Sequence, residues 1–93
     1  MLKHDRCILI IDEEKAVIES VKAIFENSDY NVYGAMNWID SFEVLKSKNP
    51  QVVLLDIRMP KIDGFEILSK IKVYDEDIEV VMLTALYDVE LAV

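Results

Sequence analysis

Four short apolar runs along the chain predict β-strands. The first, residues 7–11, and the third, residues 52–55, are continuous aliphatic stretches, which is typical of strands covered on both faces. Residues 30–33 alternate between polar and apolar side chains, and Gly34 is expected to break that strand. Residues 80–84 form the fourth run. Every run is far shorter than the ~20 apolar residues that a membrane-spanning helix needs.

Three segments between these runs carry apolar residues at helical spacing, and each is expected to form a helix. The apolar positions of the first, which is expected to end near Glu26, are Ala16, Val17, Val21, Ile24 and Phe25. Those of the second are Trp38, Phe42 and Leu45, and those of the third are Phe65, Leu68 and Ile71. Asn37 is expected to cap the second helix, and Asp63 with Glu66 fits a capping box at the third. Residues 87–93 have the pattern of a fourth helix that is just beginning.

The order of these elements, βαβαβαβ, predicts an α/β fold with a doubly wound parallel sheet. Right-handed crossover connections place helices on both faces of such a sheet and give three layers. Ligands of open α/β sheets bind beyond the carboxyl ends of the strands. The polar residues at these strand ends are therefore the candidates for a functional site.

Acidic residues stand at two of the strand ends. Asp12 and Glu13 follow the first strand, Asp56 follows the third, and Thr84 ends the fourth. Taken singly, each has a structural explanation, because acids are favoured at helix starts and polar residues are common at loop entries. Together, three carboxylates at one edge would repel one another and raise their pKa values unless a cation compensates. Oxygen ligands of this kind suit Mg²⁺, with Mn²⁺ as a second possibility.

Three motifs carry a resemblance to a known family. Residues 8–14, 53–64 and 81–85 resemble, in order and spacing, the receiver domain of two-component response regulators. The Asp-x-x-Met-Pro-x-x-x-Gly segment that begins at Asp56 is the most specific of them. The resemblance covers the whole chain and implies a single receiver domain over residues 1–93. It also implies a flavodoxin-like fold, with strand order 2-1-3-4-5.

The resemblance assigns a role to each candidate residue. It makes Asp56 the aspartate that accepts a phosphoryl group from a histidine kinase or a phosphotransfer protein. It places Mg²⁺ on Asp12, Glu13, Asp56 and the backbone carbonyl of Arg58, and it makes Thr84 the switch hydroxyl that moves to the phosphoryl group. A receiver supports its own phosphorylation and dephosphorylation, so the implied function is signalling and not turnover catalysis.

The chain also departs from the family pattern. No counterpart follows Thr84 for the family's fifth strand, the lysine on that strand, or the fifth helix. We therefore expect a flavodoxin-like sheet that lacks both elements, with residues 79–83 as an exposed edge. One face of residues 8–11 and 52–55 is expected to lose its cover. Self-association, or a longer parent chain, is the expected consequence.

Two other functions compete with the phosphoacceptor. One is a receiver-like interaction module that assembles with a partner or with itself and is never phosphorylated. The other is a phosphatase or phosphotransferase of the haloacid-dehalogenase type. That family usually places a second aspartate two residues after its nucleophile, where this chain has Arg58.

Composition narrows the function classes further. Among the 93 residues, 18 acids face 10 bases, and the net charge of −8 argues against direct binding to nucleic acid or to an anionic membrane. The hydrophobic content of 53% excludes a disordered segment. Cys7 is the one cysteine, so no internal disulfide can form. The default expectation is a soluble cytoplasmic protein.

Overall fold

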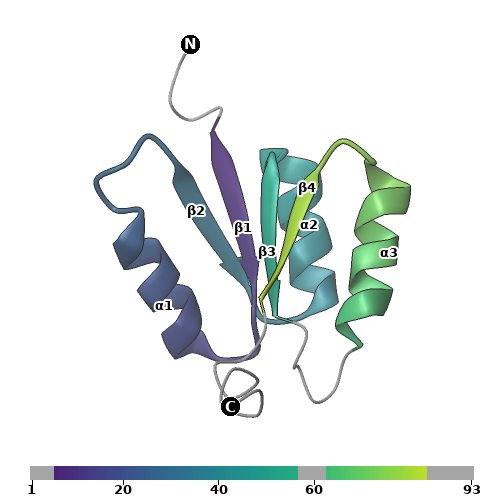
Figure 1. Cartoon of the computed structure of the whole chain (residues 1–93), viewed down its shortest axis with the longest axis horizontal. Helices are drawn as coiled ribbons and strands as arrows, with labels where there is room; N and C mark the ends of the chain where they lie inside the picture. The colour runs from purple at the N-terminus through teal and green to yellow at the C-terminus, as the bar shows by residue number, and fades with distance from the viewer. Residues whose placement is uncertain (1–5, 57–62, 84–93) are drawn as a thin grey trace, which may run out of the picture.

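The computed structural model describes residues 6–56 and 63–83, which form four strands and three helices. The strands are β1 (Cys7–Ile11), β2 (Asn31–Ala35), β3 (Val52–Asp56) and β4 (Glu79–Leu83). The helices are α1 (Lys15–Ile24), α2 (Trp38–Lys48) and α3 (Gly64–Tyr74). All strand pairs are parallel and the order is β2-β1-β3-β4, which confirms the predicted α/β fold (Figure 1). The expected fourth helix lies outside the described residues.

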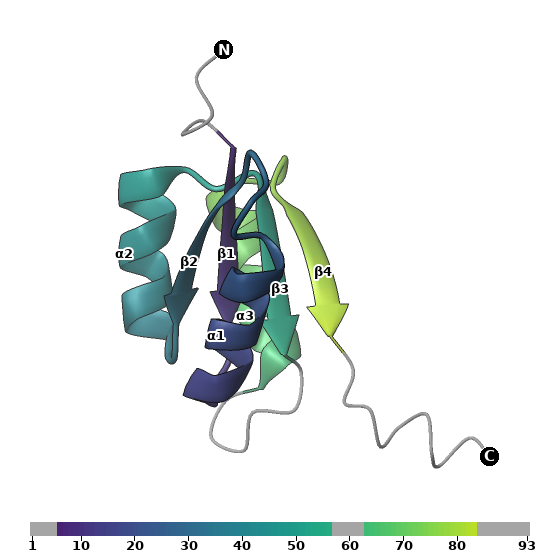
Figure 2. The ribbon, with the colours of Figure 1, turned by 90° about the vertical axis from the view of Figure 1, so that its left-hand side faces the viewer.

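The sheet separates two helical layers. Side chains from alternate positions of β1 and β3 pack with α2 and α3 on one face, and this core is lined by Leu9, Ile11, Leu45, Val53, Leu55, Ile67 and Ile71. On the other face, α1 packs beside β1 and β2 through its buried Ile18. Figures 1 and 2 show α1 beside the β2–β1 half of the sheet and α3 beside the β3–β4 half.

Gly34 does not break β2, contrary to the prediction. The strand continues to Ala35, and Gly34 pairs with Ile10 in the parallel ladder. A Cβ atom on Gly34 would lie 2.4 Å from Cγ2 of Ile18, far inside ordinary contact. The glycine is therefore a point of close approach between α1 and the sheet, which local sequence signals do not distinguish from a break.

The helix boundaries were nearly right, but two of the predicted apolar faces were wrong in part. α1 ends at Ile24, and its buried residue is Ile18, while Ala16 and Ile24 are exposed. Phe65 in α3 is also exposed, because the residues that face the sheet are Ile67 and Ile71. Helical spacing showed that these segments are amphipathic without fixing which arc turns inward.

The predicted Asn37 cap of α2 is confirmed, and the cap of α3 is present in a simpler form than predicted. The Asn37 side chain accepts a hydrogen bond from the Asp40 backbone N–H at 2.8 Å. The Asp63 side chain accepts from Phe65 N–H at 2.9 Å, which is one residue earlier than in a capping box. Helix α2 ends at Lys48, and Asn49 is its C-cap.

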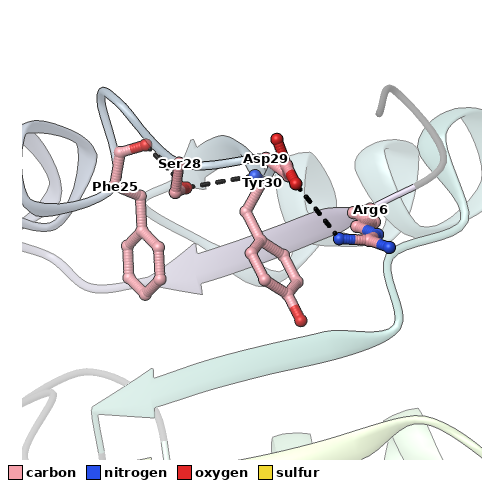
Figure 3. A network of polar contacts seen from close by, with 5 residues as sticks. All are labelled: Arg6, Phe25, Ser28, Asp29 and Tyr30. Carbon is pink, nitrogen blue, oxygen red and sulfur yellow. Dashed lines mark hydrogen bonds and ion pairs between the residues drawn. The ribbon is translucent and has the colours of Figure 1, made fainter. Parts of the chain in front are cut away.

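Hydrogen bonds and one ion pair hold the connection between α1 and β2 in place (Figure 3). Ser28 donates its hydroxyl to the Phe25 carbonyl and accepts from the Tyr30 backbone N–H, at 2.8 and 3.1 Å. Arg6 and Asp29 form an exposed ion pair at 3.3 Å. This network lies before β2, at the end of the sheet opposite Asp12.

The exposed edge predicted at β4 is confirmed for the residues that the structure describes, since β4 pairs there only with β3. The predicted loss of cover is wrong for β1, because Ile8 and Ile10 are both buried. Ile10 pairs with Gly34, on the face that α1 approaches through Ile18. Exposure falls instead on the β3–β4 half, where Leu54 is half-buried and Val81 is 43% exposed. No helix in the described ranges is long and apolar enough to cross a membrane.

Candidate functional site

The site is built by two neighbouring strands that end together. β1 and β3 are parallel and in register, with Ile11 opposite Leu55. Asp12 is the residue after Ile11, and Asp56 is the residue after Leu55, so both carboxylates emerge side by side at the carboxyl edge of the sheet. The structure thus brings together two of the acids that the sequence predicted to meet.

Asp12 is held rigidly at this edge. Its residue is 3% exposed, and its backbone N–H donates to the Ala35 carbonyl of β2 at 3.1 Å. One carboxylate oxygen, Oδ1, accepts the Glu14 backbone N–H at 2.8 Å. Asp12 could have been an ordinary helix-capping acid, but helix α1 begins at Lys15 and its N-cap is Glu14. Asp12 is therefore not the capping residue.

The electrostatics of the pair follow from burial and proximity. Burial raises the pKa of Asp12 above its ordinary value of 3.8, and the Glu14 backbone N–H opposes that rise. Asp56 raises the pKa of Asp12 further, through its negative charge and a side-chain hydrogen bond. A hydrogen bond between two carboxyl groups requires a proton on one of them. Either a shared proton or a bound cation can therefore reduce the electrostatic repulsion between the Asp12 and Asp56 carboxylates.

Glu13, the third predicted acid, is not among the groups in this contact. It is half-buried, and it is not one of the groups that shift the pKa of Asp12. Within residues 6–56 and 63–83 no group of three or more His, Cys, Asp or Glu side chains is placed to hold a metal ion. Arg58 and Thr84 lie outside the described residues. Two carboxylates remain, which matches the one or two that Mg²⁺ typically takes beside water ligands.

A pocket along α1 was not predicted from the sequence. It has a volume of about 520 Å³ and lies between α1 and the connection from β2 to α2. Its lining includes Lys15 of the first turn of α1 and Ala35, whose carbonyl binds the Asp12 backbone. The residues come from distant parts of the chain, so only the packing of α1 against β2 could reveal it.

Known proteins with the same arrangement are receiver domains. The family model described as "Response regulator receiver domain" matches residues 8–93. The sporulation initiation phosphotransferase F of Bacillus subtilis is 35% identical over 78 residues, covering 84% of this chain and 63% of its own length. The response regulator MprA of a Mycobacterium species is 30% identical, over 84% of this chain and 34% of its own. The chain thus spans less than two thirds of these relatives.

Solved structures give the same result. The N-terminal domain of a response regulator receiver protein from Methanoculleus marisnigri superposes with a TM-score of 0.76 at 33% identity, over 85% of this chain and 66% of that one. A crystal structure of the histidine kinase ThkA in complex with the response regulator protein TrrA matches with a TM-score of 0.76 at 31% identity, over 86% of this chain and 69% of that one. This chain therefore belongs to the response regulator receiver domain family of two-component systems.

Proposed function

We propose that the chain is a phosphoacceptor module that receives a phosphoryl group on Asp56. The observation that carries the proposal is the pairing of Asp12 with Asp56 at the ends of adjacent strands. The two acids differ in access, since Asp12 is buried while Asp56 is half-buried at the last position of β3. Asp56 can therefore meet an incoming donor, and Asp12 is fixed behind it.

The proposed reaction is phosphoryl transfer from a phosphohistidine of a histidine kinase or a phosphotransfer protein. The P–N bond to the imidazole breaks, a P–O bond to a carboxylate oxygen of Asp56 forms, and the imidazole leaves with a proton. Such transfers depend mainly on positioning and on neutralising charge. The rigid β3 end supplies the positioning of Asp56. A kinase–regulator complex among the structural neighbours supports this class of partner.

Charge neutralisation is proposed to come from Mg²⁺, or Mn²⁺, held by Asp12 and Asp56. When bound, the ion offsets the negative charge of the carboxylates and of the phosphoryl oxygens. The donor set fits, because both groups are hard oxygen ligands, and burial together with the negative charge of Asp56 raises the pKa of Asp12, so a cation beside them would favour the charged form. Glu13 and the Arg58 carbonyl are proposed as further ligands, and Thr84 as the switch hydroxyl. These three assignments rest on the family resemblance.

Residues 1–93 are proposed to form a single receiver domain that is phosphorylated and does not turn over substrate. Its test is incubation with a small phosphodonor such as acetyl phosphate, followed by intact mass measurement. One phosphoryl adduct should form with Mg²⁺ and none with a chelator. A chain that binds Mg²⁺ at Asp12 and Asp56 but never gains the adduct would instead support the interaction module that works without phosphorylation.

A further inference from the structure

We propose that the seam between α2 and α3 binds an acidic, amphipathic segment of a partner protein. The surface, which we term the aromatic seam, is formed by the rings of Trp38, Phe42 and Tyr74 and by the ammonium groups of Lys46 and Lys70. It involves neither Asp12 nor Asp56, so it does not depend on the proposed phosphorylation.

The three rings form one continuous apolar strip across two helices. Trp38 and Phe42, one turn apart on α2, are stacked with their centroids 5.5 Å apart. Phe42 then meets Tyr74 of α3 edge to face, at 5.4 Å. Trp38 and Phe42 are half-buried against the core, which fixes their positions. Tyr74 is 41% exposed, so this end of the strip remains open to a partner.

Lysines stand over this strip from both helices. The Lys46 ammonium lies 4.8 Å from the centroid of the Phe42 ring, and the Lys70 ammonium lies 5.5 Å from that of Trp38. Lys70 forms no ion pair with any residue in the described ranges, and Lys46 has only an exposed pair with Glu43 at 3.5 Å. Exposed pairs of this kind contribute only ~0.2–1 kcal/mol. Both ammonium groups are therefore available to a new carboxylate.

The chemistry of the occupant follows from this pairing of rings and cations. The aromatic strip favours aliphatic or aromatic side chains, and the lysines on either side favour carboxylates between them. The net charge of −8 disfavours nucleic acid and anionic membranes as occupants. A short acidic segment differs from these extended polyanions because it meets mainly the local charges of the seam, since at physiological ionic strength charges beyond ~8 Å are largely screened.

The sole tryptophan of the chain, Trp38, lies within the seam and reports on it directly. The probe is a synthetic peptide with leucines at helical spacing and glutamates between them, and its matched control carries lysines in place of the glutamates. Titration with the glutamate peptide should shift Trp38 emission to saturation, and the lysine peptide should leave it unchanged. Equal shifts with both peptides, or none with either, would overturn the proposal.

Charge-reversed variants test whether the peptide binds at the aromatic seam or elsewhere on the surface. Lys46→Glu with Lys70→Glu should weaken binding of the glutamate peptide by about tenfold or more, which corresponds to ~1.4 kcal/mol. Lys15→Glu with Lys22→Glu on α1 makes the same change in net charge away from the seam and should leave the affinity within about twofold. Tyr74→Ala should also weaken binding, with no change in charge.

Two further results would also refute the assignment. One is equal loss of affinity in the two charge-reversed variants, because the effect would then be one of net charge. The other is Trp38 emission that changes when the wild-type protein is diluted but not when the Lys46→Glu, Lys70→Glu variant is diluted. A second copy of the chain would then be the occupant of the seam.

Discussion

Adding a single methyl group at Gly34 should push α1 off the sheet. In Gly34→Ala the new Cβ would lie 2.4 Å from Cγ2 of Ile18, whereas ordinary contacts of a Cβ begin near 3.4 Å. The obstacle is a branch atom next to the helix backbone and not the flexible end of a side chain, so rotation of Ile18 cannot relieve it cheaply. The helix or the strand must move by roughly 1 Å.

Overpacking of this kind typically costs ~1–3 kcal/mol. No glycine in the described residues has a positive φ, so alanine meets no backbone strain at this position. Alanine in place of glycine within a strand would otherwise gain ~0.5–1 kcal/mol. The net loss should therefore centre on about 1 kcal/mol, within ~0–2.5 kcal/mol. A loss of about 1 kcal/mol lowers the Tm of a domain of this size by roughly 4–8 °C.

A double-mutant cycle measured by urea unfolding isolates the contact. Ile18 is buried, so Ile18→Ala alone should cost ~2–5 kcal/mol. Because that change removes Cγ2, Gly34→Ala should cost nothing further, or even stabilise, in its background. The reasoning fails if Gly34→Ala destabilises the protein equally with and without the Ile18 side chain, since the cost would then lie elsewhere.

Three further predictions concern other parts of the molecule. Burial raises the pKa of Asp12, so its protonated form should stabilise the metal-free protein below the ordinary carboxyl pKa, and this stabilisation should be lost as the pH rises through the raised pKa. In the presence of a chelator, the urea midpoint of wild type should therefore fall more with rising pH than that of Asp12→Asn, and parallel curves would contradict the assignment. Asn37→Ala removes the acceptor for the Asp40 N–H and should lower the stability measured by thermal unfolding by ~1 kcal/mol, whereas Asn37→Ser should retain most of it. Equal losses of stability in the two variants would rule out capping as the cause. The β4 edge should make the protein self-associate at low micromolar concentration in sedimentation, and Val81→Lys should reduce this; a compact wild-type monomer would disprove it.

Much of the fold could be predicted because its signals are local. The continuous aliphatic runs of β1 and β3 indicated strands covered on both faces, and the helical spacing between them implied crossovers. The meeting of Asp12 and Asp56 followed from the same argument, since neighbouring parallel strands end at the same edge. These features depend on patterns within short stretches of sequence and not on which side chains from distant segments pack against them.

What could not be predicted depends on contacts between distant segments. Gly34 has the local signature of a strand break, and only the approach of Ile18 explains why a glycine stands inside β2. Phe65 and Ile67 both lie on apolar arcs of α3, and the position of the sheet decides which of them is buried. The aromatic seam escaped prediction for the same reason, because Tyr74 reaches Phe42 only after α2 and α3 pack side by side.

Location of the phosphoryl group tests the central claim most directly. Wild type, Asp56→Asn and Asp63→Asn are incubated with acetyl phosphate and Mg²⁺, and their intact masses are compared. Asp63→Asn is the matched control, because asparagine also accepts the hydrogen bond that caps α3 at this exposed position. The account predicts one labile phosphoryl adduct on wild type and on Asp63→Asn, and none on Asp56→Asn. An adduct that persists in folded Asp56→Asn would contradict it.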